Sequence, residues 1–360
     1  MAFVIVFAQG SIYPCKYSQS SANSVFRIPH SNMHSGRYYR LLESIYWTRR
    51  DVYVLVLIGT IPTVLYQVFG WHWLAIPWLP VTLVGTAAAF LVGFRNTQTY
   101  NRLWEARQIW GAIVNTSRSW GMLVKACVHN DEGAHRELLY RHCGWLTALR
   151  HQLREPRSWE SMEKPRNREF KQGFSVPEYQ IALGDDLKPY LSPAEWTYIM
   201  DKRNRATQLI VRQSEHLMRL QKEGRIDPLN FVELERLLID LYEQQGKCER
   251  IKNFPYPRQF ASVNLYFVWL LVILLPFGML NEFRSFGEHF TWLTIPFTVI
   301  VGWVFTMLES IGVATENPFE GGPNDVPISA LSRTIEIDLR DMLDETDLPL
   351  PLVPINKILM

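Results

Sequence analysis

Residues 52–94 read VYVLVLIGTIPTVLYQVFGWHWLAIPWLPVTLVGTAAAFLVGF, and none of these 43 positions holds Asp, Glu, Lys or Arg. A helix needs about 20 apolar residues to cross the roughly 30 Å hydrocarbon core of a bilayer. The stretch is long enough for two crossings, and we predict a break around residues 67–73. There Gly70 and His72 lie among aromatic residues, which favour the membrane interface. The chain is therefore predicted to enter the membrane, turn, and return to the side it left.

Two further uncharged blocks, residues 259–281 and 290–308, lie toward the C-terminus and are joined by a short polar loop. They predict a second hairpin in the lipid bilayer. Residues 95–257 between the hairpins are charged and predominantly helical in pattern. Within them we predict helices at residues 100–125, 131–152, 192–223 and 230–248. The predicted fold is an all-α membrane protein with four transmembrane helices plus a helical cytoplasmic region.

Basic residues set the orientation of the hairpins. They precede the first span, follow the second and precede the third: Arg37, Arg40, Arg49, Arg50, Arg95, Arg102, Arg107 and Arg258. The two hairpin tips carry only Arg284 between them. Because Lys and Arg concentrate on the cytoplasmic side of membrane proteins, both termini and the middle region are predicted to be cytoplasmic.

Five regions are predicted along the chain. The first, residues 1–36, is either a flexible extension or the product of a start codon placed upstream of Met33, since its composition is typical of disorder. The others are an N-terminal transmembrane hairpin at 37–94, the helical cytoplasmic region at 95–257, a C-terminal transmembrane hairpin at 258–313 and a cytoplasmic C-terminal segment at 314–360.

The motifs of enzymes and nucleic-acid binding are missing from this sequence. It has no glycine-rich phosphate loop, HExxH, CxxC or Gly-x-Ser-x-Gly motif, so we expect neither an enzyme nor a cofactor. A net charge of +2 without a dense basic run does not favour nucleic acid. Three cysteines of the middle region are predicted to be buried, reduced thiols, and four histidines to be solvated or capping rather than metal ligands. They are Cys127, Cys143, Cys248, His129, His135, His142 and His151.

The second predicted span carries two parallel ridges. Thr86, Phe90 and Phe94 are four residues apart and therefore share one helix face. Small residues at 85, 89 and 93 form a ridge beside it, of the kind that lets helices approach closely in a membrane. One reading places the small residues against neighbouring copies and the aromatic residues on a narrow axis. The other places the Phe ridge against lipid or a neighbouring helix, and the pattern alone favours this second reading.

Three groups of motifs resemble the bestrophin family, most closely its bacterial members. They are GFRN, YNRLWEAR and WG within residues 93–111, CERI and FPYP within 248–257, and ENPF, NDVP and IEIDL within 316–339. The ordered set covers roughly residues 33–351. The resemblance implies a homopentameric ion channel with an axial pore in the plasma (inner) membrane of a bacterium. The neck of that pore would fall on Thr86, Phe90 and Phe94, and a second, cytoplasmic aperture on Val232.

One feature of the family transfers poorly to this chain. Animal bestrophins bind calcium through an acidic cluster just after Asn-Pro-Phe, whereas here Gly321 and Gly322 occupy two of the positions that would hold carboxylates. Calcium takes about six to eight oxygen ligands. Asn317, Glu320 and Asp325 are therefore only weak metal candidates, and we expect Asn317 and Asp325 to brace their segment instead.

The family contains both anion and cation channels, so the ion must be argued from this chain. A cation pore is expected to place Asp or Glu rings at its constriction, and the predicted neck has none. Phe rings present positive edges, and Thr86 is expected to add hydroxyl donors. We therefore predict chloride as the permeant ion. The alternatives are a monovalent cation (sodium) channel of the same fold, a secondary transporter with helices broken at prolines, and a membrane-anchored scaffold.

Overall fold

The computed structural model describes residues 41–129, 131–161, 167, 173, 175–356 and 358–360. Over these residues the regular structure is helical, and strand pairing is limited to one isolated bridge between Ile355 and Ile358. The all-α fold predicted from the sequence is confirmed. The predicted N-terminal extension at 1–36, with Arg37 and Arg40, lies outside the described residues.

The long uncharged stretch forms two helices with the predicted break between them. Helix α1 spans Leu41–Trp47, α2 spans Arg49–Gln67, and a short 3-10 helix η1 spans His72–Leu74 before α3 begins at Trp78. Pro62 lies inside α2 without breaking it. Helices α2 and α11 pack against each other, and the Trp303 indole of α11 donates a hydrogen bond to Thr48 Oγ1 at 2.8 Å.

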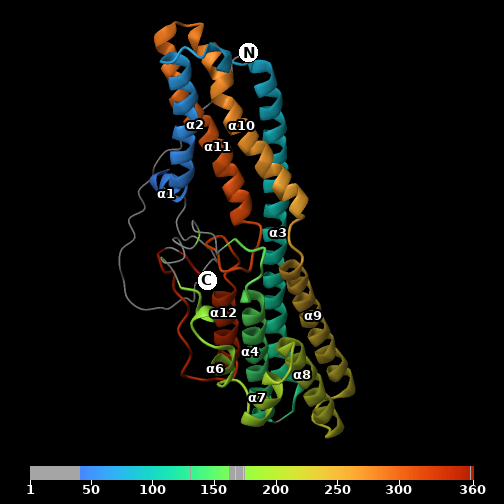
Figure 1. Ribbon diagram of the computed structural model, residues 1–360. Helices are drawn as coiled ribbons and strands as arrows, with labels where there is room; N and C mark the ends of the chain where they lie inside the picture. Colours follow the sequence, from blue (N-terminus) through green and yellow to red (C-terminus); the bar gives the residue numbers. More distant parts are fainter. Residues whose placement is uncertain (1–40, 130, 162–166, 168–172, 174, 357) are drawn as a thin grey trace, which may run out of the picture. The chain divides into compact units, whose positions relative to one another are not determined.

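Helix α3, Trp78–Cys127, runs for 50 residues without interruption (Figure 1). At about 1.5 Å per residue it is on the order of 75 Å long, far longer than a bilayer is thick. Its first part packs against α10 and α11, and its later part against α9, α4 and α12. The predicted boundary between residues 94 and 95 therefore falls inside one continuous helix, which joins the apolar helices to the helices of the charged middle region.

The second hairpin consists of α10 at Arg258–Arg284, the 3-10 helix η3 at Glu288–Leu293, and α11 at Thr294–Ala314. Pro276 lies inside α10 and does not break it. Small residues bring these helices close together: a Cβ added to Gly302 of α11 would lie 2.5 Å from Leu55 Cδ2 of α2. The membrane hairpins are thus packed tightly around glycine positions.

Three helical stretches of the described chain are long and apolar enough to cross a membrane: His72–Cys127, Arg258–Arg284 and Glu288–Ala314. Helix α2 is not one of the three, and four crossings stay a prediction. Its first turn contains Arg49, Arg50 and Asp51, which lower the mean hydropathy of a helix of only 19 residues.

The remaining helices are α4 (Glu132–Arg154), η2 (Pro177–Tyr179), α6 (Leu183–Leu187), α7 (Pro193–Met200), α8 (Arg205–Lys222), α9 (Pro228–Asn253) and α12 (Ile328–Asp341). The prediction of one helix over residues 192–223 is wrong, because the chain breaks at 201–204. Asn204 begins the second helix there, accepting a hydrogen bond from Thr207 N at 3.0 Å. Its side chain therefore acts as a helix N-cap.

Together with the later part of α3, these helices enclose a core in which Trp110, Trp120 and Trp145 are fully buried. Cys127, Cys143 and Cys248 are buried as predicted. The prediction for His142 is wrong: its ring is buried, bonds Ser117 Oγ at 2.9 Å and stacks beside Trp120. Burial lowers the pKa of His142 to about 3, so the ring is a neutral core group.

Candidate functional site

One face of α3 stays uncovered along most of the helix. We call it the α3 stripe, and its members recur every three or four residues: Thr86, Phe90, Phe94, Thr97, Asn101, Trp104, Gln108, Gly111 and Asn115. All of them are exposed. The stripe is apolar at the level of Phe90, and after Phe94 its members are uncharged and mainly polar, with Trp104 as the large apolar exception.

The two phenylalanines of the stripe have few partners within the chain. The side chain of Phe90 is 72% exposed and that of Phe94 is 44% exposed, touching Phe260 of α10 at a ring-centroid distance of 6.4 Å. The opposite face of α3, with Ala88 and Val92, is buried against neighbouring helices. An exposed Phe ridge of this kind needs lipid, water or another chain to cover it.

The small-residue ridge beside the stripe divides between two environments. A Cβ at Gly85 would lie 3.4 Å from Leu271 Cδ1 of α10, so this position faces a helix of the same chain. Gly93 has open space around it, and Ala89 is exposed. Only the later part of the ridge is therefore available for packing against another copy.

The prediction that Thr86 supplies hydroxyl donors is wrong for this chain. Its Oγ1 donates to the carbonyl of Thr82 in the preceding turn, at 2.9 Å. A hydroxyl has one proton, so the proton of Thr86 is used within its own helix. What Thr86 presents outward is an oxygen acceptor and a methyl group.

The charge of α3 is strongly asymmetric. Glu105 is its single acidic residue, and this carboxylate forms an ion pair with Arg250 of α9. The basic residues of α3 are Arg95, Arg102, Arg107, Arg118 and Lys125. No member of the α3 stripe carries a carboxylate.

A buried arginine follows the stripe's second phenylalanine, and sequence reasoning used it only as an orientation signal. Arg95 is 3% exposed and pairs with Glu309 of α11 at 3.1 Å and with Glu316 at 3.0 Å. Glu316 also forms an ion pair with Arg258 at the start of α10, at 3.0 Å. These ion pairs fix the position of α3 relative to α10 and α11 directly beside Phe94.

Val232, the predicted cytoplasmic aperture, lies in the first turns of α9 and is 59% exposed. It is therefore not an ordinary core valine. Neighbouring Leu229 is 82% exposed, so the start of α9 presents a small apolar surface. Within one chain this surface has no cover.

The three weak metal candidates lie near one another, and hydrogen bonds from neighbouring groups occupy both carboxylates. Glu320 accepts from Ser161 N and Ser161 Oγ, both at 2.7 Å, and from Asn317 Nδ2 at 3.4 Å. Asp325 accepts from Gly321 N at 2.7 Å and from Arg154 Nη1 at 3.3 Å. The described residues contain no cluster of three or more His, Cys, Asp or Glu side chains placed to hold a metal.

Burial gives this segment an unusual protonation. It raises the pKa of Glu320 to about 8, with the neighbouring Asp325 adding to the effect. Burial also raises the pKa of Asp325, although the guanidinium of Arg154 opposes the shift. Arg154 supplies the local positive charge for Asp325, and the hydrogen bond from Gly321 N joins Asp325 to its own segment.

Comparison with known proteins gives a family and a fold. Residues 41–341 match the family model described as bacterial/fungal bestrophin protein. A voltage-dependent anion channel-forming protein of Ralstonia nicotianae is 29% identical over 283 residues, covering 77% of this chain and 82% of the relative. One of Escherichia coli K12 is 26% identical over 279 residues, covering 76% and 80%.

Solved structures agree with the fold described above. A bacterial bestrophin homolog from Klebsiella pneumoniae matches with a TM-score of 0.70 at 23% identity, covering 82% of this chain and 98% of that one. At this level of identity the match establishes the arrangement of helices. The roles of individual residues must be argued from this chain.

Proposed function

The chain belongs to the family of bacterial and fungal bestrophin proteins, and from this membership we propose that it forms an anion channel as a homopentamer. The family places it among membrane ion channels, and the protein is not an enzyme. Five copies would surround an axial pore, each contributing its α3. The protein is an integral membrane protein, and in our proposal both termini lie in the cytoplasm below a bacterial inner membrane.

The α3 stripe is the observation that carries the proposal. It is exposed over a long helix whose other face is buried, and after Phe94 it is mainly polar, with Trp104 as its one large apolar member. Lipid would suit the apolar part, but Thr97, Asn101 and Gln108 continue the same face with groups that prefer water. A water-filled axis with an apolar constriction suits the whole stripe.

The neck is assigned to Thr86, Phe90 and Phe94. In a pentamer the rings of Phe90 and Phe94 would form two stacked apolar layers in which an ion receives little hydration. Apolar constrictions of this kind gate by losing their water. Ring edges turned toward the axis carry partial positive charge and favour an anion.

Anion selectivity is supported by the distribution of charge. Cation channels use rings of carboxylates, whereas the only carboxylate of α3 is neutralised by Arg250. The relatives named as anion channels agree with this choice. Chloride is the permeant ion that we propose, with Val232 at a second aperture on the cytoplasmic side.

The division of the chain into two membrane hairpins and a cytoplasmic body is part of the same proposal. Helices α2 to α3 and α10 to α11 would form the hairpins, and the helices between them the body. Pro62 and Pro276 leave their helices intact, which favours a channel over a transporter with broken helices.

The proposal is tested by current recordings from the full chain in planar bilayers under a potassium chloride gradient. We expect unitary currents that reverse close to the chloride equilibrium potential. Reversal close to the potassium potential would identify the cation channel instead. Coupled, saturable flux without unitary currents would identify a transporter. Absence of any flux would favour a membrane-anchored scaffold.

A matched pair of substitutions locates the pore. Thr97 of the α3 stripe and Thr197 of α7 are both exposed, and each hydroxyl donates to the carbonyl four residues earlier. Thr97→Asp should shift the reversal potential toward the cation, because it adds a ring of carboxylates to the axis. Thr197→Asp adds the same charge on a helix away from α3 and should shift it much less. Equal shifts would refute the placement of the stripe on the axis.

A further inference from the structure

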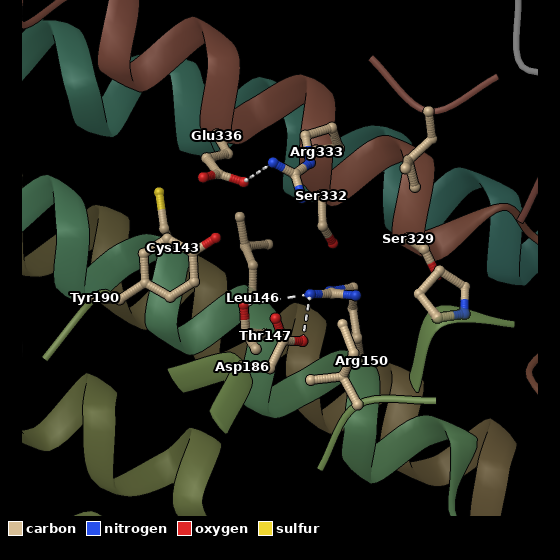
Figure 2. A pocket seen from close by; sticks show the side chains of 13 residues that line it. Cys143, Leu146, Thr147, Arg150, Asp186, Tyr190, Ser329, Ser332, Arg333 and Glu336 are labelled. Carbon is tan, nitrogen blue, oxygen red and sulfur yellow. Dashed lines mark hydrogen bonds and ion pairs between the residues drawn. The ribbon is translucent and has the colours of Figure 1, made fainter. Parts of the chain in front are cut away.

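A small pocket of about 60 Å³ lies in the cytoplasmic body, between α12 on one side and α4 with α6 on the other (Figure 2). Its polar walls carry Arg333 and Glu336 from α12, and Arg150 and Asp186 from α4 and α6. Its apolar walls are Leu146, Pro177, Ile181 and Leu352. The channel proposed above makes no use of this pocket.

The α12 wall offers hydrogen-bond donors. Arg333 Nη1 pairs with Glu336 at 3.2 Å, and among the described residues Nη2 and Nε of the guanidinium form no ion pair. Glu336 is held on its other side by Arg340 Nη1 at 3.6 Å and by the hydroxyl of Tyr190. On this wall the carboxylate of Glu336 is therefore fully paired, whereas the guanidinium of Arg333 is paired through one nitrogen.

The opposite wall offers an acceptor. Asp186 uses one oxygen, Oδ2, for Arg150 at 3.1 Å and for His151 at 3.0 Å. Its Oδ1 takes no part in these bonds, and the described residues provide it with no other ion-pair partner. Arg150 cannot act as the counterpart, because it is also bonded to Glu178 and lies close to Thr147 Oγ1.

The lining charges cancel, two guanidiniums against two carboxylates, so the pocket does not favour a net charge. An oxyanion would bind Arg333 but would lie near Asp186 and Glu336, and a simple cation would meet two arginines. A molecule with both charges satisfies both walls. A carboxylate can receive the two free N–H groups of Arg333, and an ammonium can donate to Oδ1 of Asp186.

The volume limits the size of such a molecule. A cavity needs about 10–15 Å³ for each water-sized group, so the pocket holds about four to six heavy atoms. Glycine and alanine have this size, and larger amino acids do not fit. We propose that this pocket is a binding site for a small zwitterionic amino acid, with its carboxylate on Arg333 and its ammonium on Asp186.

The test is calorimetric titration of the purified full-length protein with glycine and L-alanine. Both should bind, whereas acetate and methylamine, which each keep one charge, should bind about tenfold more weakly or worse. L-Leucine should not bind. If phosphate binds as tightly as glycine, the pocket is an anion site and the zwitterion proposal is wrong. Absence of glycine binding would also refute the proposal.

Substitutions on the two walls separate the roles. Arg333→Gln and Asp186→Asn should each weaken glycine binding about tenfold or more. Arg212→Gln is the matched control, because Arg212 forms a similar i,i+3 ion pair, with Glu215, away from the pocket. Glycine binding that survives either wall substitution would overturn the assignment.

A second variant guards against loss of folding. Leu352 lines the pocket from the C-terminal segment and is only partly buried, so Leu352→Trp should fill the pocket while leaving both ion-pair walls intact. This variant should retain the thermal stability of the parent and lose glycine binding. Retained binding in Leu352→Trp would place the ligand elsewhere and refute the site.

Discussion

Replacing Phe90 by alanine tests whether this side chain lines the neck of the pore or packs in an ordinary core. Burying a phenylalanine fully is worth about 3–5 kcal/mol against alanine. The side chain of Phe90 is 72% exposed within one chain, so its removal should cost the subunit only about 1 kcal/mol. The same substitution widens the proposed neck by the volume of five rings. We therefore expect a small change in stability together with a higher unitary conductance or a higher open probability.

Two other phenylalanines provide matched controls for this experiment. Phe286 lies in the loop before η3 and is 73% exposed. Phe286→Ala therefore removes the same side chain, at a similar exposure, from a position away from the neck. Phe319 is 1% exposed, and Phe319→Ala should cost about 3–5 kcal/mol of stability. The measurements are thermal unfolding in detergent and single-channel recording in planar bilayers. Phe90→Ala currents identical to those of the parent would refute the neck assignment. A change in current that Phe286→Ala reproduces would refute it as well.

Three further predictions concern stability. Burial raises the pKa of Glu320 from 4.5 to about 8, so the folded state holds the proton more tightly than the unfolded chain. The resulting stabilisation is complete below pH 4.5 and disappears as the pH rises to about 8, so Glu320→Gln should flatten the fall of the melting temperature across this window. An unchanged pH profile in that variant would contradict the raised pKa. Gly302→Ala should cost about 1–3 kcal/mol, because the new Cβ would lie 2.5 Å from Leu55 Cδ2, whereas Gly93→Ala, with open space around it, should cost far less in the same melting assay. Arg95→Met should cost about 3–5 kcal/mol, because it leaves two carboxylates without their buried partner, and a melting temperature equal to that of the parent would show that these ion pairs are dispensable.

The break between the first two long helices was predictable because its signals are local. The uncharged stretch at 52–94 is long enough for two helices, and the break between α2 and α3 falls where aromatic residues replace aliphatic ones. Helical periodicity alone placed Thr86, Phe90 and Phe94 on one face, since residues four apart lie on the same side of an α-helix. The same reasoning missed the division of residues 192–223, where Asn204 caps a new helix inside a continuous amphipathic pattern.

The sequence by itself determined an all-α membrane protein, the family marks and the ridge on α3, because hydropathy and helical period depend on neighbours along the chain. Only the tertiary structure decided that Arg95 meets Glu309 and Glu316, which are more than 200 positions away. It also decided that His142 is a neutral core group and that Arg333 and Asp186 line the same pocket. Burial and charge pairing depend on which distant segments fold together, and no local pattern encodes that choice.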